Sequence, residues 1–124
     1  MPEQSKADRQ GNPVAQYNVG LMYYNGEGLA KDQKESFKWL LKSAEQGYPK
    51  AMASVAWRYD SGLGTEQSFQ DAAKWYQNAA YKGVPWAMYN LGLMYDKGDG
   101  VDKNSEIAFK WISRAAERDY PKAQ

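Results

Sequence analysis

The sequence contains neither cysteine nor histidine among its 124 residues. Because cysteine is absent, the chain has no disulfide, no thiol nucleophile and no cysteine-based zinc site. Because histidine is absent, it lacks the commonest metal ligand, the commonest general base and the usual switch near neutral pH. There is no apolar run of about 18 residues, and the N-terminal stretch MPEQSKADRQ lacks the apolar core of a secretion signal. We therefore expect no transmembrane helix, and a cytoplasmic protein if Met1 is the natural start.

An excess of one charge is also absent, since 16 basic residues face 15 acidic ones and the net charge is +1. This balance argues against nucleic acid or an anionic membrane as partner, because both attract a basic surface. The acidic stretch from Asp96 to Glu106 does not match a calcium loop, since neither register places glycine and glutamate where that loop needs them. No Gly-x-Ser-x-Gly elbow is present either. We expect no metal, no cofactor and no catalysis, and a hydrolase is the enzyme alternative.

Tyrosine and tryptophan are abundant, with ten and five residues, and an internal repeat accounts for part of this abundance. An offset of 36 residues aligns most of the chain with itself without gaps. We expect a single domain, 1–124, in which residues 1–10 are a partial preceding unit or an N-terminal cap and residues 119–124 start a partial fourth unit. The three full units are residues 11–46, 47–82 and 83–118.

Each unit is typical of two helices joined by a Gly-x-Gly loop, and no segment shows the alternation of a strand. The first helix should open at a proline and end at the first glycine, which adopts a left-handed conformation without strain. The second helix should open after an N-cap residue and stop before the glycine that begins the next unit. The boundary residues are Pro13, Pro49 and Pro85; Gly26, Gly62 and Gly98; and Asp32, Ser68 and Asn104.

The Gly-x-Gly pairs do not indicate a phosphate site. A phosphate loop follows a strand and opens a helix, whereas these pairs follow a helix and occur three times. Two of the intervening residues, Glu27 and Asp99, carry negative charges that repel phosphate. We expect the second glycine of each pair, Gly28, Gly64 or Gly100, to let the loop fold back toward its partner helix.

The third unit carries a family pattern, AMYNLGLMY at residues 87–95 followed by Lys110, Trp111 and the pair Ala115-Ala116. With the 36-residue period, this pattern resembles the Sel-one-like repeat (SLR) family, a relative of the tetratricopeptide repeats. The resemblance implies an all-α, right-handed α/α superhelical solenoid whose first helices line a concave face. It also implies scaffold or adaptor work in protein complexes, with no shared catalytic residues.

The five tryptophans fall into two groups. Trp39, Trp75 and Trp111 recur at one repeat position, so we expect them to pack between helices. Trp57 and Trp86 have no tryptophan counterpart in the other units, and this departure marks them as candidates for function.

The outward face of the first helices is the predicted binding groove. On a helical wheel the stripe that includes Ala15 and Val19 turns toward the core, and the opposite face carries aromatic and amide side chains. Tryptophan and tyrosine dominate the hot spots of protein interfaces. The alternative is that neighbouring first helices pack these side chains against each other. The predicted contact residues are Tyr17, Asn18, Leu21, Tyr24, Lys50, Trp57, Asp60, Trp86, Tyr89, Asn90, Leu93 and Asp96.

These features predict a non-catalytic interaction module, an adaptor or scaffold that holds a protein or peptide in the groove. The alternative function is a dedicated neutralising partner of one effector, such as an immunity protein or antitoxin. A second interaction hypothesis is end-to-end self-association, because the last helix would lack a following unit to cover its apolar stripe. The residues of that stripe are Ala108, Ile112, Ala115 and Ala116, with Tyr120 beside them.

Overall fold

The computed structural model describes residues 11–118 and Tyr120. Within this part the chain forms six α-helices of 13 residues each and no strand. The predicted partial unit at residues 1–10 lies outside the described residues, and of the predicted start of a fourth unit only Tyr120 is described. The helices are α2 (Pro13–Asn25), α3 (Gln33–Glu45), α4 (Pro49–Ser61), α5 (Phe69–Tyr81), α6 (Pro85–Lys97) and α7 (Ser105–Glu117).

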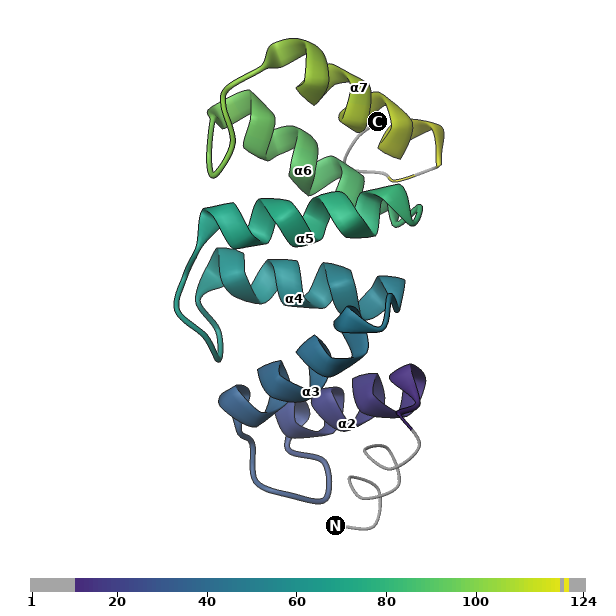
Figure 1. Ribbon diagram of the computed structural model, residues 1–124, viewed down its shortest axis with the longest axis vertical. Coiled ribbons are helices and arrows are strands. Elements are labelled where there is room, and N and C mark those ends of the chain that lie inside the picture. The colour runs from purple at the N-terminus through teal and green to yellow at the C-terminus, as the bar shows by residue number, and fades with distance from the viewer. Residues whose placement is uncertain (1–10, 119, 121–124) are drawn as a thin grey trace.

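The helices stack in chain order along the long axis of the molecule, from α2 at one end to α7 at the other (Figure 1). The most extensive contacts join the two helices of one unit, α2 with α3, α4 with α5 and α6 with α7. Contacts of α3 with α4 and of α5 with α6 link each unit to the next. The protein is therefore an all-α solenoid of three helix–loop–helix repeats, as the sequence period predicts.

The helix boundaries follow the predicted signals. A proline lies in the first turn of each first helix, and the glycine that follows the helix has a φ between 75° and 79°. Only glycine adopts this left-handed conformation without strain. At the second helices, the side chains of Asp32, Ser68 and Asn104 accept the backbone N–H three residues on, at 3.1, 3.2 and 3.0 Å. These N-caps satisfy amide groups that the helix itself leaves unpaired.

Close packing within unit one depends on Gly20. A methyl group on this residue would lie 2.7 Å from Leu40 Cγ, and the Gly20 carbonyl accepts the Ser36 hydroxyl at 2.7 Å. In unit two, Ala56 and Tyr76 take the places of Gly20 and Leu40, and both are fully buried. The centre of the solenoid is thus filled by an aromatic ring at a position that is aliphatic in unit one.

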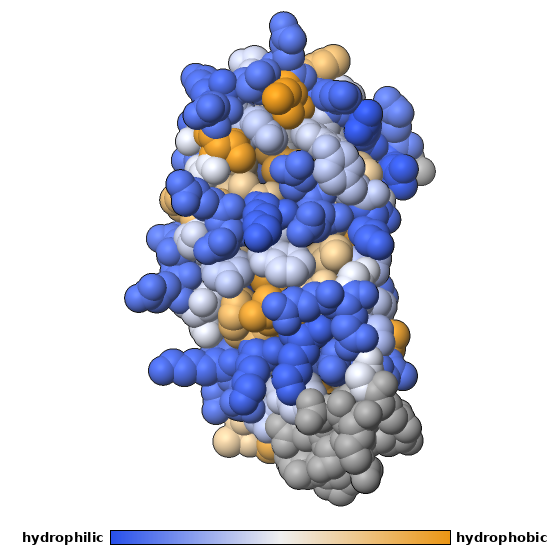
Figure 2. Space-filling model, viewed as in Figure 1, coloured by the Kyte–Doolittle hydropathy of each residue, from blue (hydrophilic) through white to orange (hydrophobic). Residues whose placement is uncertain are grey.

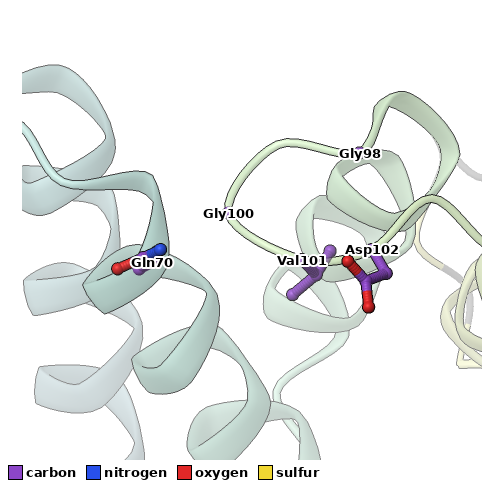
Figure 3. A pocket seen from close by; sticks show the side chains of 5 residues that line it. All are labelled: Gln70, Gly98, Gly100, Val101 and Asp102. Carbon is purple, nitrogen blue, oxygen red and sulfur yellow. The ribbon is translucent and has the colours of Figure 1, made fainter.

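The second glycine of each Gly-x-Gly pair lies at a contact between units. A methyl group on Gly100 would lie 2.9 Å from the Gln70 backbone nitrogen at the start of α5, and Figure 3 shows the loop bending toward that point. Gly64 lies in the same way directly against the Gln33 carbonyl of α3. A methyl group on Gly28, which has no described unit before it, would meet no described residue within 4 Å. We expected this glycine to serve its own unit, but the structure places its contact on the preceding one.

Apolar side chains fill the interior of the solenoid. Trp39 and Trp111 are 6% exposed and pack among the helices as expected, whereas Trp75 is only half-buried. On the face drawn in Figure 2, apolar surface is broken into small patches separated by hydrophilic side chains. None of the helices in the described ranges has the length and apolar content needed to cross a membrane.

Candidate functional site

None of the twelve predicted contact residues is buried in the core, but their exposure divides them into two sets. The exposed set combines polar side chains with two aromatic ones, Tyr24 at 38% and Trp57 at 39%. The remaining seven residues are half-buried, so part of each surface already packs within the chain. The exposed residues are Asn18, Tyr24, Lys50, Trp57 and Asp96, and the half-buried ones are Tyr17, Leu21, Asp60, Trp86, Tyr89, Asn90 and Leu93.

Two of the half-buried tyrosines make the same contact in different units. Tyr17 packs edge-on against Tyr48 at 5.3 Å between ring centroids, and Tyr89 packs against Tyr120 at 5.4 Å. The two pairs are 72 residues apart, twice the repeat period. Such ring pairs stabilise a fold, so Tyr17 and Tyr89 serve the junction between units whatever else they bind.

Trp86 also packs within the chain. Its ring stands edge-on to Tyr76 at a centroid distance of 5.9 Å, and Tyr76 is fully buried. Truncating Trp86 would therefore disturb the core as well as the surface. This contact makes Trp57 the cleaner probe of partner binding.

A buried arginine joins the exposed aromatic residues of the two neighbouring first helices. The guanidinium carbon of Arg58 lies 5.1 Å from the ring centroid of Tyr24 in α2 and 5.6 Å from that of Trp57 in α4. Arg58 itself is only 4% exposed. The structure thus brings Tyr24 and Trp57 together around a cation, in the range where cation–π attraction operates.

Arg58 was absent from the residues predicted to bind. Its repeat position carries Met22 in unit one and Met94 in unit three, and that position lies on the stripe expected to face the core. The signal that identifies it is the replacement of methionine by a charged residue in one unit only. Burial lowers the pKa of Arg58 from its usual value, and the phenols of Tyr24 and Tyr17 partly oppose that shift.

A second small site joins α4 to α6. Its hollow of about 110 Å³ brings together three predicted contact residues, Asp60, Asn90 and Leu93. Burial raises the pKa of Asp60, nearby Asp99 raises it further, and Lys97 opposes both. A cationic or hydrogen-bonding group of a partner would therefore relieve the charge on Asp60. The lining residues are Asp60, Asn90, Leu93, Met94, Lys97 and Asp99.

Tyr76 lies behind this face, and its hydroxyl is buried with no hydrogen-bond partner among the described residues. Burial raises the pKa of Tyr76, and the negative charge of Asp60 raises it further. In the unfolded chain the phenol ionises near pH ~10. Above that pH the unfolded state has lost a proton that the folded state keeps, so stability should fall as the pH rises.

The Tyr76→Phe variant should accordingly be as stable as the wild type near neutral pH, or more stable. Its stability should fall less as the pH rises above the ordinary tyrosine pKa. The phenylalanine ring fills the same space without an unsatisfied hydroxyl, and removing such a group is nearly neutral or stabilising. Urea unfolding at about pH 8 and about pH 10.5, either side of the ordinary tyrosine pKa, measures the difference. An equal or steeper loss in the phenylalanine variant would contradict this role of the Tyr76 hydroxyl.

Two features of the described surface bear on metal and phosphate binding. Among residues 11–118 and Tyr120, no group of three acidic, histidine or cysteine side chains comes close enough to hold a metal ion. The open hollow in Figure 3 is lined by Gln70, Gly98, Gly100, Val101 and Asp102. This lining contains an acid and no basic side chain, which does not favour phosphate.

The apolar stripe of α7 is covered in part. Ala108 and Ala115 are buried, because this side of α7 packs against α6, whereas Ile112, Ala116 and Tyr120 are half-buried. The most exposed apolar side chain of α7 is Phe109, at 75%. Whether this end binds a second copy of the chain stays a prediction.

Comparison with known proteins identifies the repeat. The family model of the Sel1 repeat matches the chain three times, at residues 13–48, 49–84 and 87–120. A Sel1 repeat protein from Oxalobacter formigenes is 38% identical with a TM-score of 0.90, covering 99% of this chain and 92% of that one. The protective antigen c5321 of uropathogenic Escherichia coli, which displays an SLR fold, is 36% identical with a TM-score of 0.92. That match covers 98% of this chain and 26% of the antigen.

More distant matches agree with this result. Helicobacter pylori cysteine rich protein B is 20% identical with a TM-score of 0.74, covering 96% of this chain and 90% of that one, and shows the fold alone. A sel1-like repeat-containing protein of Acanthamoeba polyphaga mimivirus is 44% identical over 39 residues, 32% of this chain. The chain therefore spans only 7% of that relative's length in the match. Three consecutive family matches over nearly the whole length show that the chain belongs to the Sel1 repeat family.

Proposed function

We propose that the chain is a non-catalytic binding module that holds a peptide or loop of a partner protein on the outward face of α2, α4 and α6. Sel1 repeat proteins are generally protein-interaction scaffolds without catalysis. The observation that carries the proposal is the pair of exposed aromatic rings, Tyr24 and Trp57, on neighbouring first helices. Exposed tyrosine and tryptophan supply large contact area, and such residues dominate binding energy at interfaces.

The surroundings of this pair favour a polypeptide ligand. Exposed Asn18 on α2 and half-buried Asp60 on α4 offer hydrogen bonds on the same helices. On α6, the Asn90 amide nitrogen already donates to the Trp86 carbonyl at 2.8 Å, and its side-chain oxygen can accept. Amide and carboxylate groups match the backbone N–H and C=O groups of an extended segment or loop. An exposed face of mixed aromatic and polar side chains suits a protein surface better than a small molecule, which needs an enclosed pocket.

Two biological uses fit the same surface. An adaptor would hold its partner within a larger complex, whereas a dedicated neutralising partner, such as an immunity protein, would cover one effector. The identity of the bound protein decides between them.

Capture of partners by the immobilised chain tests the proposal. The wild-type protein and a Tyr24→Ala/Trp57→Ala variant are each immobilised and incubated with an extract of the source organism. Each captured protein is then purified and titrated against both. We expect saturable binding to the wild type that falls by more than about thirtyfold in the variant, since two hot-spot side chains are removed. Equal affinity for both proteins would place the interface elsewhere, and turnover of a hydrolase substrate by the purified chain would favour the enzyme alternative.

A further inference from the structure

We propose that Arg58 is the anchor for a carboxylate of the partner, so that the segment bound on the first-helix face carries an aspartate, a glutamate or a chain end. This inference rests on the proposed function and specifies the chemistry of the bound segment. The arginine sits between the two exposed aromatic residues that the proposed interface depends on.

The charge of Arg58 is not compensated within the described part of the chain. Its side chain is 4% exposed, and no carboxylate pairs with it there. Its one hydrogen bond runs from Nη1 to the Ser54 carbonyl of its own helix at 3.3 Å, and Nε has no partner. A buried charge without a counter-ion is costly, and proteins usually pair such a group.

The aromatic contacts of Arg58 restrict how a partner could bind its guanidinium. The guanidinium carbon lies over the rings of Tyr24 and Trp57. An arginine that stacks on aromatic rings does so through its faces rather than its edges. The N–H groups lie along the edges, where a carboxylate can accept two parallel hydrogen bonds. An apolar side chain of the same segment can cover the exposed rings and exclude water, which strengthens the ion pair.

The charge count favours a carboxylate over a phosphate. A phosphate group carries close to two negative charges at neutral pH and is usually held by several donors or cations. The side chains over which the Arg58 guanidinium lies are the rings of Tyr24 and Trp57, and neither is a cation. A single guanidinium matches the single charge of a carboxylate.

The competing explanation is that Arg58 is a packing substitute. Methionine stands at the equivalent position in units one and three, as Met22 and Met94, and the arginine stem could fill the same space. The two explanations differ in what the Arg58→Met variant should do. If Arg58 binds a carboxylate of the partner, the Arg58→Met variant should be at least as stable as the wild type. It should lose only the preference for segments that carry an acidic residue.

The test begins with the stability of Arg58→Met. We expect a melting temperature equal to or above that of the wild type, because the change removes an unpaired buried charge and introduces the residue that units one and three use. A clear fall in melting temperature would overturn the proposal, since it would show that Arg58 is already satisfied in the free chain.

The second step uses a display library of random dodecapeptides selected separately on the wild type and on Arg58→Met. We expect one position rich in aspartate or glutamate in the wild-type selection and no such position in the variant selection. The best wild-type peptide is then synthesised with its acid and with the matching amide. The amide peptide should bind the wild type at least about tenfold more weakly than the acid peptide does. The two peptides should bind Arg58→Met with nearly equal affinity. This double-mutant cycle isolates the interaction between Arg58 and the acidic side chain.

The outcomes separate this inference from the proposed function. Peptides without an acid that bind both proteins equally, yet fail on Trp57→Ala, would overturn the Arg58 assignment and leave the binding face intact. Peptides that bind Trp57→Ala as well as they bind the wild type would overturn both. Displacement of the peptide by inorganic phosphate at lower concentration than by acetate would overturn the choice of carboxylate.

Discussion

Gly64→Ala is expected to lower the free energy of unfolding by about 3 kcal/mol or more, a large share of the stability of a small domain. Gly64 has a φ of 80°, which costs an alanine roughly 1–2 kcal/mol. The added methyl group would also lie directly against the Gln33 carbonyl and 3.2 Å from Phe37 Cβ, both in the preceding unit. Because the first obstacle is helix backbone, it cannot rotate aside, and the junction between units one and two must shift. Urea unfolding followed by circular dichroism measures the loss.

Gly28→Ala provides the matched control. Gly28 has a φ of 75°, so its backbone penalty should be the same, roughly 1–2 kcal/mol. A methyl group there would meet none of the described residues within 4 Å. The difference between the two variants therefore reports the contact between units alone. Equal losses would contradict this role of the second glycine.

Trp57→Ala is expected to weaken partner binding by about 2 kcal/mol, roughly thirtyfold, as the loss of a central aromatic anchor does. Its cost to folding should be no more than about 1 kcal/mol, because the side chain is 39% exposed and stays outside the core. Isothermal titration with the captured partner measures the first effect, and thermal unfolding measures the second.

Phe109→Ala is the control for this change. Phe109 is the more exposed aromatic residue, at 75%, but it lies on α7. Loss of an exposed ring there should leave affinity unchanged if the first helices form the interface. A larger loss of affinity in the Phe109 variant than in the Trp57 variant would move the interface to the end of the solenoid.

The repeat made the helices predictable. A proline, two glycines and an N-cap residue recur at a fixed offset, and each acts through local backbone chemistry that needs no knowledge of distant contacts. The N-cap bonds of Asp32, Ser68 and Asn104 and the left-handed glycines appear where the sequence placed them.

Contacts between units were harder to predict. The wheel assigns faces to one helix at a time, so it could not tell that Gly64 meets the preceding unit or that Trp86 meets Tyr76. These contacts depend on how far each unit rotates relative to the last, and the sequence does not state that rotation directly.

Arg58 illustrates a different limit of the wheel. Its repeat position falls on the stripe that a helical wheel assigns to the core, and Arg58 is indeed buried. A wheel predicts burial from position and does not indicate what a buried charge does. A charged residue that replaces methionine in one of three repeats breaks the pattern as Trp57 and Trp86 do. Positions that break a repeat are informative on buried faces as well as on exposed ones.

Hydrogen–deuterium exchange of the chain, with and without its purified partner, tests the proposed binding face most directly. Binding on the first helices should slow exchange in α2, α4 and α6, most strongly near Tyr24 and Trp57, because bound segments are shielded and stabilised. Exchange in α3, α5 and α7 should change less. Protection confined to α3, α5 and α7, or to the end of the solenoid at Phe109, would contradict the proposal that this face binds the partner.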